Sequence, residues 1–182
     1  MTVSIVPVAA AYRERWGALF QGYADFYGRP SDDAHKDLVW AWLTDPAHEL
    51  EGYLALVDGE AVGLVHVRRM PSPLRGCDVG FLDDLFVDRA ARGGRVGEAL
   101  LGFVAGLARE RGWPVVRWIT GDDNYRARGL YDRVARKTAW NLYEMPAQAG
   151  PALAGAGEER LELSEDPVDR AARRVVLGQG GL

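Results

Sequence analysis

The sequence has little cysteine, no long apolar run and no strong excess of one charge sign. Cys77 is the only cysteine among 182 residues, so the chain cannot form an internal disulfide, which favours a reducing compartment and an expected cytoplasmic location. No apolar run approaches the ~20 residues of a membrane helix. The N-terminus has no basic segment followed by an apolar one, so we expect no secretion signal and no membrane partner.

The charge balance excludes further classes. The 22 basic and 26 acidic residues give a net charge of −4, which argues against a general nucleic-acid binder and is compatible with a cationic substrate. His35, His48 and His66 show no metal-ligand spacing, and one cysteine cannot complete a zinc site, so we expect no metal. The overall composition, 48% hydrophobic and 26% charged, is typical of a globular chain.

Hydrophobic periodicity predicts an α/β chain with one main domain over residues 1–146. Residues 147–157 are rich in Ala, Gly and Pro and are predicted to form a linker. An extension over 158–182 follows, with a predicted helix at 166–177. Within the domain we expect strands at 4–8, 81–87, 114–120 and 140–145, a hairpin at 53–67 around Asp58-Gly59, and a loop at 71–76. We expect helices at 10–26, from Ser31 or Asp32 to 43, at 96–111 and after the candidate cap Asn124.

The most informative segment joins the strand at 81–87 to the helix at 96–111. The intervening turn Arg92-Gly93-Gly94-Arg95-Val96-Gly97 combines glycines with two arginines. Glycines let a ligand approach the backbone, and a helix N-terminus offers unpaired N–H groups with a partial positive charge. This combination favours an anionic phosphate ligand. Neither a Gly-Lys-Ser/Thr loop nor G-x-G-x-x-G is present, so a nucleotide P-loop or a Rossmann site is not indicated.

These residues resemble the acyl-CoA loop of the GNAT N-acetyltransferase superfamily, whose pattern is Arg/Gln-x-x-Gly-x-Gly/Ala. Arg92 and Gly97 match it, and Arg95 stands where the family usually has glycine. Asn124, Ala127, Leu130 and Tyr131 resemble the family's second cofactor segment, Asn-x-x-Ala-x-x-Leu-Tyr. The resemblance covers about residues 3–145. It implies a GNAT fold, a mixed and partly antiparallel sheet with helices on both faces, and acetyl-CoA as co-substrate.

The resemblance also implies roles for individual residues. Tyr131 would be the general acid at the CoA sulfur; its apolar helical stripe by itself favours a core tyrosine, and the spacing from Asn124 to Tyr131 reverses that preference. Asn124 would bond the pantetheine arm, cap its helix, or do both. The expected cofactor-binding residues are Leu85, Phe86, Val87, Arg92, Gly93, Gly94, Arg95, Val96, Gly97 and Asn124.

The apolar strand carries two adjacent carboxylates, Asp83 and Asp84. Burying them is costly unless they are paired, and successive strand residues face opposite sides unless a bulge re-aims them. The run Phe81 to Val87 is close to a form associated with the diamine and polyamine branch, with Asp83 in place of glutamate. That resemblance implies Asp83 as the base, acting through water, and Asp84 as the binder of the amine's positive charge. The alternative is that one of them caps a helix or pairs with an arginine.

Three aromatic residues on the first helix, Tyr23, Phe26 and Tyr27, are candidates for a substrate wall, with Tyr23 and Tyr27 as expected substrate-binding residues. An aromatic stripe is more often core, so at least two of the three are expected to pack inside. His66 lies in a strand pattern and is interpreted as structural.

The function predicted from these residues is direct acetyl transfer from acetyl-CoA to a primary amine, with a small polyamine, a diamine or a lysine-like amine favoured. A protein or peptide amine acetyltransferase and a non-catalytic acyl-CoA-binding regulatory module are the alternatives. The small-molecule amine is the expected partner. A homodimer stabilised by residues 158–177 is also expected, because a short isolated helix needs a surface to cover.

Overall fold

The computed structural model describes residues 2–145. The chain divides into two compact units, Met1–Thr120 and Gly121–Leu182. The predicted linker at 147–157 and the extension at 158–182 lie outside the described residues, so their proposed role in dimerisation stays a prediction. None of the helices in the described part of the chain is long and apolar enough to cross a membrane.

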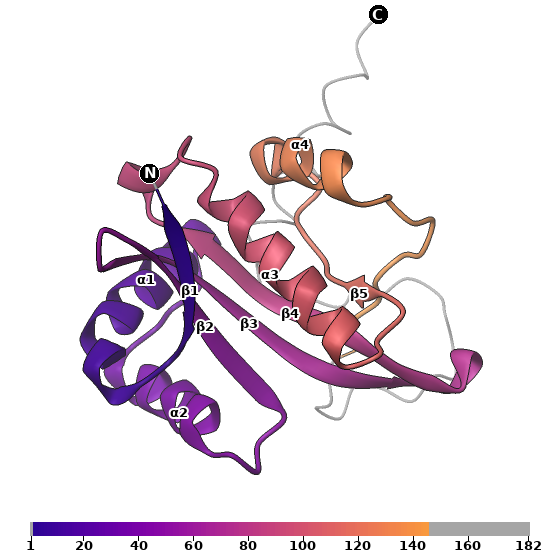
Figure 1. The fold of residues 1–182 in the computed structure, drawn as a ribbon, viewed down its shortest axis with the longest axis horizontal. Coiled ribbons are helices and arrows are strands. Elements are labelled where there is room, and N and C mark those ends of the chain that lie inside the picture. Colours follow the sequence, from indigo (N-terminus) through magenta and orange to yellow (C-terminus); the bar gives the residue numbers. More distant parts are fainter. Residues whose placement is uncertain (1, 146–182) are drawn as a thin grey trace, which may run out of the picture. The chain divides into compact units, whose positions relative to one another are not determined.

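The first unit is built on a five-stranded sheet in the order β1-β2-β3-β4-β5 (Figure 1). The strands are β1 (Val3–Pro7), β2 (Leu50–Val57), β3 (Glu60–Ser72), β4 (Cys77–Val87) and β5 (Val116–Arg117). The first four pair in antiparallel fashion, and β5 is parallel to β4. The sheet is therefore mixed and partly antiparallel, as the sequence predicts.

Helices cover both faces of this sheet. A short 3₁₀ turn (Ala10–Tyr12) leads into α1 (Arg13–Phe26), and α2 (Asp33–Thr44) follows; these helices form one side of the core with Trp16, Leu19 and Phe20 fully or almost fully buried. On the opposite face, α3 (Val96–Glu110) lies along β3 and β4 (Figure 1). Its buried residues recur at helical spacing because only one stripe meets the sheet: Val96, Leu100, Val104 and Leu107.

Local signals set several element ends. The Asp32 carboxylate accepts a hydrogen bond from the His35 backbone N–H and so caps α2, as predicted. Asp58 and Gly59 both have positive φ, 51° and 85°, which is the backbone of a type I′ hairpin turn between β2 and β3. In the second unit, the Asn124 side chain accepts from the Ala127 N–H and caps α4 (Tyr125–Val134).

Strand β4 contains a bulge at the position of the two carboxylates. His66 of β3 pairs with Asp84, whereas the next β3 residue, Val67, pairs with Leu82. Asp83 is therefore an extra residue in β4 with no cross-strand partner. The bulge shifts the side-chain alternation by one residue from this point to the end of the strand.

Some predicted boundaries are wrong. β3 continues through Ser72 where a loop was expected, β4 begins at Cys77 instead of 81, and β5 spans two residues instead of 114–120. Residues 140–145 form no strand, and Trp140, Tyr143 and Met145 are more than 80% exposed. Their apolar, aromatic composition suits a strand only when a neighbouring strand supplies hydrogen bonds and a surface to cover, and no strand in residues 2–145 does so.

Gly80 should be essential for the pairing of β4 with β5. A Cβ at Gly80 would lie 2.8 Å from Cε3 of Trp113 and 3.1 Å from Cγ2 of Val116, whereas one at Gly102 on α3 would meet nothing within 4 Å. We expect Gly80→Ala to lower the free energy of unfolding by about 1–3 kcal/mol through overpacking. Gly102→Ala should raise it by about 0.5–1 kcal/mol, because glycine is unfavourable inside a helix. Urea unfolding of both variants measures this, and equal effects would contradict the packing.

Candidate active site

Both adjacent carboxylates, Asp83 and Asp84, lie on the face of the sheet that α1 covers. Asp84 contacts His66, and Asp83 contacts Arg68. His66 and Arg68 are two residues apart on β3 and therefore share one face. Without the bulge, one carboxylate would point to the other face, where Leu82 is almost fully buried beneath α3. The bulge is what brings the two acids together.

Asp83 is held by an arginine. Arg68 Nε lies 3.2 Å from Oδ1 and 3.1 Å from Oδ2 of Asp83, and the Arg68 guanidinium also stacks over the Phe81 ring at 4.9 Å. Burial raises the pKa of Asp83 above its ordinary value, and the Arg68 hydrogen bond only partly opposes this. The alternative that one acid pairs with an arginine thus applies to Asp83, while its raised pKa makes it the more basic of the two carboxylates.

Asp84 has a different environment. Its Oδ2 lies 2.7 Å from Nδ1 of His66, which is completely buried. Burial raises the pKa of Asp84, but the hydrogen bond and the charge interaction with His66, together with a hydrogen bond from the Tyr23 side chain, outweigh the effect of burial, so the pKa lies below the ordinary value. Two neighbouring acids whose environments push their pKa values apart are suited to different roles.

The predicted phosphate-binding turn follows the end of β4. Its start is anchored by Asp88, which pairs with Arg15 of α1 at 2.7 Å and accepts from the Ala90 N–H. Arg92 Nε donates to the Val87 carbonyl at 3.2 Å, and Gly93 has a φ of 93°. α3 then begins at Val96. The turn therefore presents the N-terminal N–H groups of a long helix, as an anion site requires.

Arg95 occupies the one position of this turn that departs from the family pattern. Its φ is 61°, in the left-handed region, and its side chain pairs with Glu98 at 2.8 Å. A side chain in this region costs roughly 1–2 kcal/mol, and glycine avoids that cost. Arg95 therefore adopts a backbone conformation that glycine would adopt without this cost.

Strands β4 and β5 stay paired over only two residues, Gly80 with Val116 and Phe81 with Arg117. Beyond Phe81, no strand in residues 2–145 pairs with the outer edge of β4. The expected cofactor-binding residues Leu85, Phe86 and Val87 lie on this edge and are half-buried. The Val87 carbonyl on this edge already accepts from Arg92, so the outward backbone groups of Leu85 are the ones that could meet the amides of a ligand.

Asn124 and Tyr131 belong to the second unit. Tyr131 is half-buried on α4, and that helix has no buried residue, which gives no support to a core role for this tyrosine. Asn124 caps the helix with its side-chain oxygen at 3.3 Å from the Ala127 nitrogen. The capping role predicted for Asn124 is confirmed, and its role toward pantetheine stays a prediction.

The aromatic residues of α1 differ from expectation. Tyr23 packs at the edge of the core, 6.4 Å from the Phe86 ring, and bonds Asp84. Tyr27 is half-buried against Tyr23, and Phe26 is 52% exposed. The expectation that at least two of the three pack inside is wrong: Tyr23 packs against the core cluster, whereas Phe26 and Tyr27 lie at the end of α1 and are not part of that cluster. Tyr23 reaches Asp84, and Tyr27 contacts the Tyr23 ring at 5.2 Å; their substrate-binding role stays a prediction.

Sequence reasoning did not assign Arg68 as the partner of Asp83, Arg15 as the partner of Asp88, or the contacts of His66. The spacing of His66 and Arg68 in β3 was the available signal, since alternate residues of a strand share a face. Which face they share depends on the bulge, which no local pattern marks.

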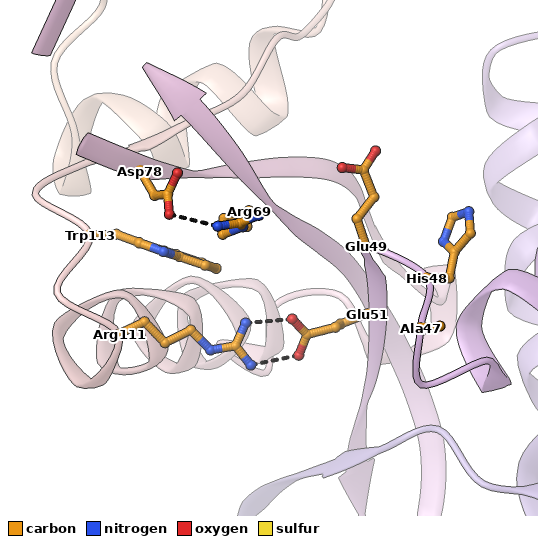
Figure 2. Close-up of a pocket in the computed structure, with 8 residues that line it drawn as sticks. All are labelled: Ala47, His48, Glu49, Glu51, Arg69, Asp78, Arg111 and Trp113. Carbon is orange, nitrogen blue, oxygen red and sulfur yellow. Dashed lines mark hydrogen bonds and ion pairs between the residues drawn. The ribbon is translucent and has the colours of Figure 1, made fainter. Parts of the chain in front are cut away.

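A hollow of about 540 Å³ lies elsewhere in the first unit (Figure 2). Arg111 forms a two-pronged ion pair with Glu51, and Arg69 pairs with Asp78 at 3.0 Å. Burial, with the Glu51 hydrogen bond, raises the pKa of Tyr53 to about 12. The hollow contains none of the predicted site residues, and its paired charges tie the end of α3 to the sheet. Over residues 2–145, no group of three or more His, Cys, Asp or Glu could hold a metal.

Comparisons with known proteins bear on the family and the fold of the chain. The model of the acetyltransferase (GNAT) family matches residues 16–135. The D-amino-acid N-acetyltransferase HPA3 of Saccharomyces cerevisiae is 34% identical over 133 residues, which cover 72% of this chain and 83% of the yeast protein.

Solved structures share the fold. A ribosomal-protein-alanine N-acetyltransferase from Brucella melitensis biovar Abortus is 25% identical with a TM-score of 0.68, over 80% of this chain and 99% of that one. The aminoglycoside N-acetyltransferase AAC(6')-Iy, solved in complex with CoA, superposes with a TM-score of 0.67 at 20% identity, over 80% of this chain and 95% of its own.

Asp84 should stabilise the fold in a pH-dependent way. Its pKa is lowered in the folded state, so its contribution is present above the unfolded value of about 4 and is lost as pH falls through the folded value. We expect Asp84→Asn to lower the free energy of unfolding by about 1 kcal/mol at pH 7, the difference between a charged and a neutral hydrogen bond. Denaturant unfolding from pH 7 to 3 should show the gap to wild type narrowing. The exposed Asp132→Asn on α4 is the control, and a pH-independent gap would contradict the assignment.

Proposed function

The chain belongs to the GNAT acetyltransferase family, and from that premise we propose that it transfers the acetyl group of acetyl-CoA directly to the primary amine of a small molecule. The observation that carries the proposal is the bulge of β4. It sets Asp83 and Asp84 side by side on one face of the sheet, in the strand that leads into the Arg92–Gly97 turn.

Acetyl-CoA would be held by the chain's backbone more than by its side chains. The turn from Arg92 to Gly97 and the first N–H groups of α3 suit the pyrophosphate. The unpaired edge of β4 at Leu85–Val87 suits the amides of the pantetheine arm, and Asn124 is the proposed further contact. Arg92 adds a full positive charge beside the turn.

The two carboxylates have different roles toward the amine. Asp84, whose pKa is lowered and which stays ionised, binds the substrate's ammonium group. Asp83, whose pKa is raised, takes one proton from it through a water molecule. The neutral amine attacks the thioester carbon, the C–S bond breaks, and the Tyr131 phenol gives its proton to the sulfur. The amide nitrogen loses its second surplus proton to solvent, and no acyl-enzyme forms.

The nature of the acceptor follows from the charge at the site. Arg68 neutralises Asp83, so the pair of acids offers about one net negative charge, which suits an amine with a single ammonium. The yeast relative is named for D-amino acids, which does not fit a polyamine preference. We therefore propose an amino-acid-type amine as the first candidate and a diamine, a polyamine or a lysine-like side chain as the second.

An amine panel tests the proposal. Thiol release from acetyl-CoA is followed with D- and L-amino acids, diamines, polyamines and short peptides. We expect the highest kcat/KM with an amino acid. It should exceed the kcat/KM of any diamine about tenfold or more, which is the difference that one charge-assisted contact produces. A diamine optimum would restore the preference predicted from the sequence. Acetyl-CoA binding without thiol release for any amine would instead indicate the non-catalytic module.

Two variants test the general acid and the general base separately: Tyr131→Phe tests the acid, and Asp83→Asn tests the base. Tyr131→Phe should lower kcat by roughly 10²–10⁴, typical of a lost general acid, with little change in stability. Asp83→Asn should reduce turnover most at low pH, where the amine is most protonated. Tyr125→Phe is the matched control, since Tyr125 is 76% exposed on the same helix. Steady-state kinetics against pH decide; an unchanged profile for Asp83→Asn removes it as the base.

A further inference from the structure

Asp84 is the half-buried end of a hydrogen-bonded series of three side chains, Trp16, His66 and Asp84. Trp16 of α1 and His66 of β3 are both completely inaccessible to solvent. Trp16 Nε1 lies 3.0 Å from His66 Nε2, and His66 Nδ1 lies 2.7 Å from Asp84 Oδ2. His66 and Asp84 are direct cross-strand partners beside the bulge. The series therefore links the interior of the core to the proposed ammonium site.

The tryptophan fixes the protonation of the histidine. An indole N–H only donates hydrogen bonds, so His66 Nε2 must accept and can carry no proton. The proton of the neutral ring is then on Nδ1, which donates to Asp84. A doubly protonated ring would place two N–H donors face to face at 3.0 Å. The rings of Trp16 and Phe20 lie 6.0 and 5.9 Å from the His66 ring and leave it little freedom to turn.

This tautomer decides which acid keeps its charge. Arg68 cancels the charge of Asp83, whereas a neutral His66 gives Asp84 a hydrogen bond without cancelling its charge. Tyr23 of α1 donates a second hydrogen bond, which is also uncharged. An ionised carboxyl group has about four acceptor positions, so capacity remains for an ammonium group.

We propose that Trp16 and His66 are positioning residues that hold Asp84 as an oriented, uncancelled carboxylate for the ammonium of the acceptor. The inference rests on the proposed function and deepens it by assigning acceptor affinity to a buried tryptophan–histidine pair. A histidine with a purely structural role would satisfy the hydrogen-bonding needs of Trp16 and Asp84. Its replacement would not change the KM for the acceptor more than the KM for acetyl-CoA.

The tautomer is measured first, by ¹⁵N NMR of the histidine rings at pH 7. His66 is identified by the signal lost in His66→Gln, which separates it from His35 and His48. We expect a protonated Nδ1 and an unprotonated Nε2 in the wild type, and a changed ring signal in Trp16→Phe. A protonated Nε2, or an imidazolium, in the wild-type protein overturns the inference.

Kinetics then test the consequence. His66→Leu removes both hydrogen bonds, whereas His66→Gln can accept from Trp16 and donate to Asp84. We expect the acceptor KM to rise about tenfold or more in His66→Leu, the effect of weakening one charge-assisted contact, and to recover within a few-fold in His66→Gln. The KM for acetyl-CoA should stay unchanged in both, which also shows that the variants fold. The exposed His35→Gln is the control.

The outcomes separate the two proposals. Equal losses for acceptor and acetyl-CoA, or no rescue by glutamine, assign His66 to the fold alone and overturn the inference. If His66→Leu does not fold, Trp16→Phe takes its place in the same comparison. Absence of turnover with every amine overturns the proposed function, whereas an active enzyme with Nε2 protonated overturns only the role of the pair.

Discussion

The bulge at Asp83 is the constraint on which the site depends. Two adjacent carboxylates in a regular strand would point to opposite faces, and one of them would enter the dry layer beneath α3, beside Leu82. The extra residue turns both to the α1 face, where Arg68 and His66 meet them. It costs β4 one cross-strand pairing at that point.

The same strand links the acids to the turn that follows. Its end is fixed by the Arg15–Asp88 ion pair, which ties α1 to the start of the turn, and Arg92 is bonded back to the strand at Val87. Its outer edge separates from β5 after Phe81. The chain therefore places a carboxylate pair, a strand edge and a helix N-terminus along one continuous segment, and the proposed acetyl transfer rests on this arrangement.

Charge pairing distinguishes this site from a simple acidic patch. Arg68 balances Asp83, while His66 and Tyr23 hydrogen-bond to Asp84. Two neighbouring acids thus acquire unequal basicity from their neighbours alone. The resulting single net charge suits an acceptor that presents one ammonium group to the site, as proposed above.

Local signals in the sequence determined the helices, the hairpin and the turn: Asp32 and Asn124 as caps, Asp58-Gly59 as the turn of the hairpin, and the apolar stripe of α3. They also indicated the family through Arg92–Gly97 and Asn124–Tyr131, because these motifs are contiguous. Only the tertiary structure decided the length of β5 and the absence of a strand at 140–145, since strand formation depends on partners far away in the chain. The tertiary structure also decided that Asp83 and Asp84 share one face of the sheet, because the bulge in β4 sets that face and no local pattern marks a bulge. It decided the hydrogen bonds from Trp16 to His66 and from His66 to Asp84 as well, because these residues come from three different elements, α1, β3 and β4.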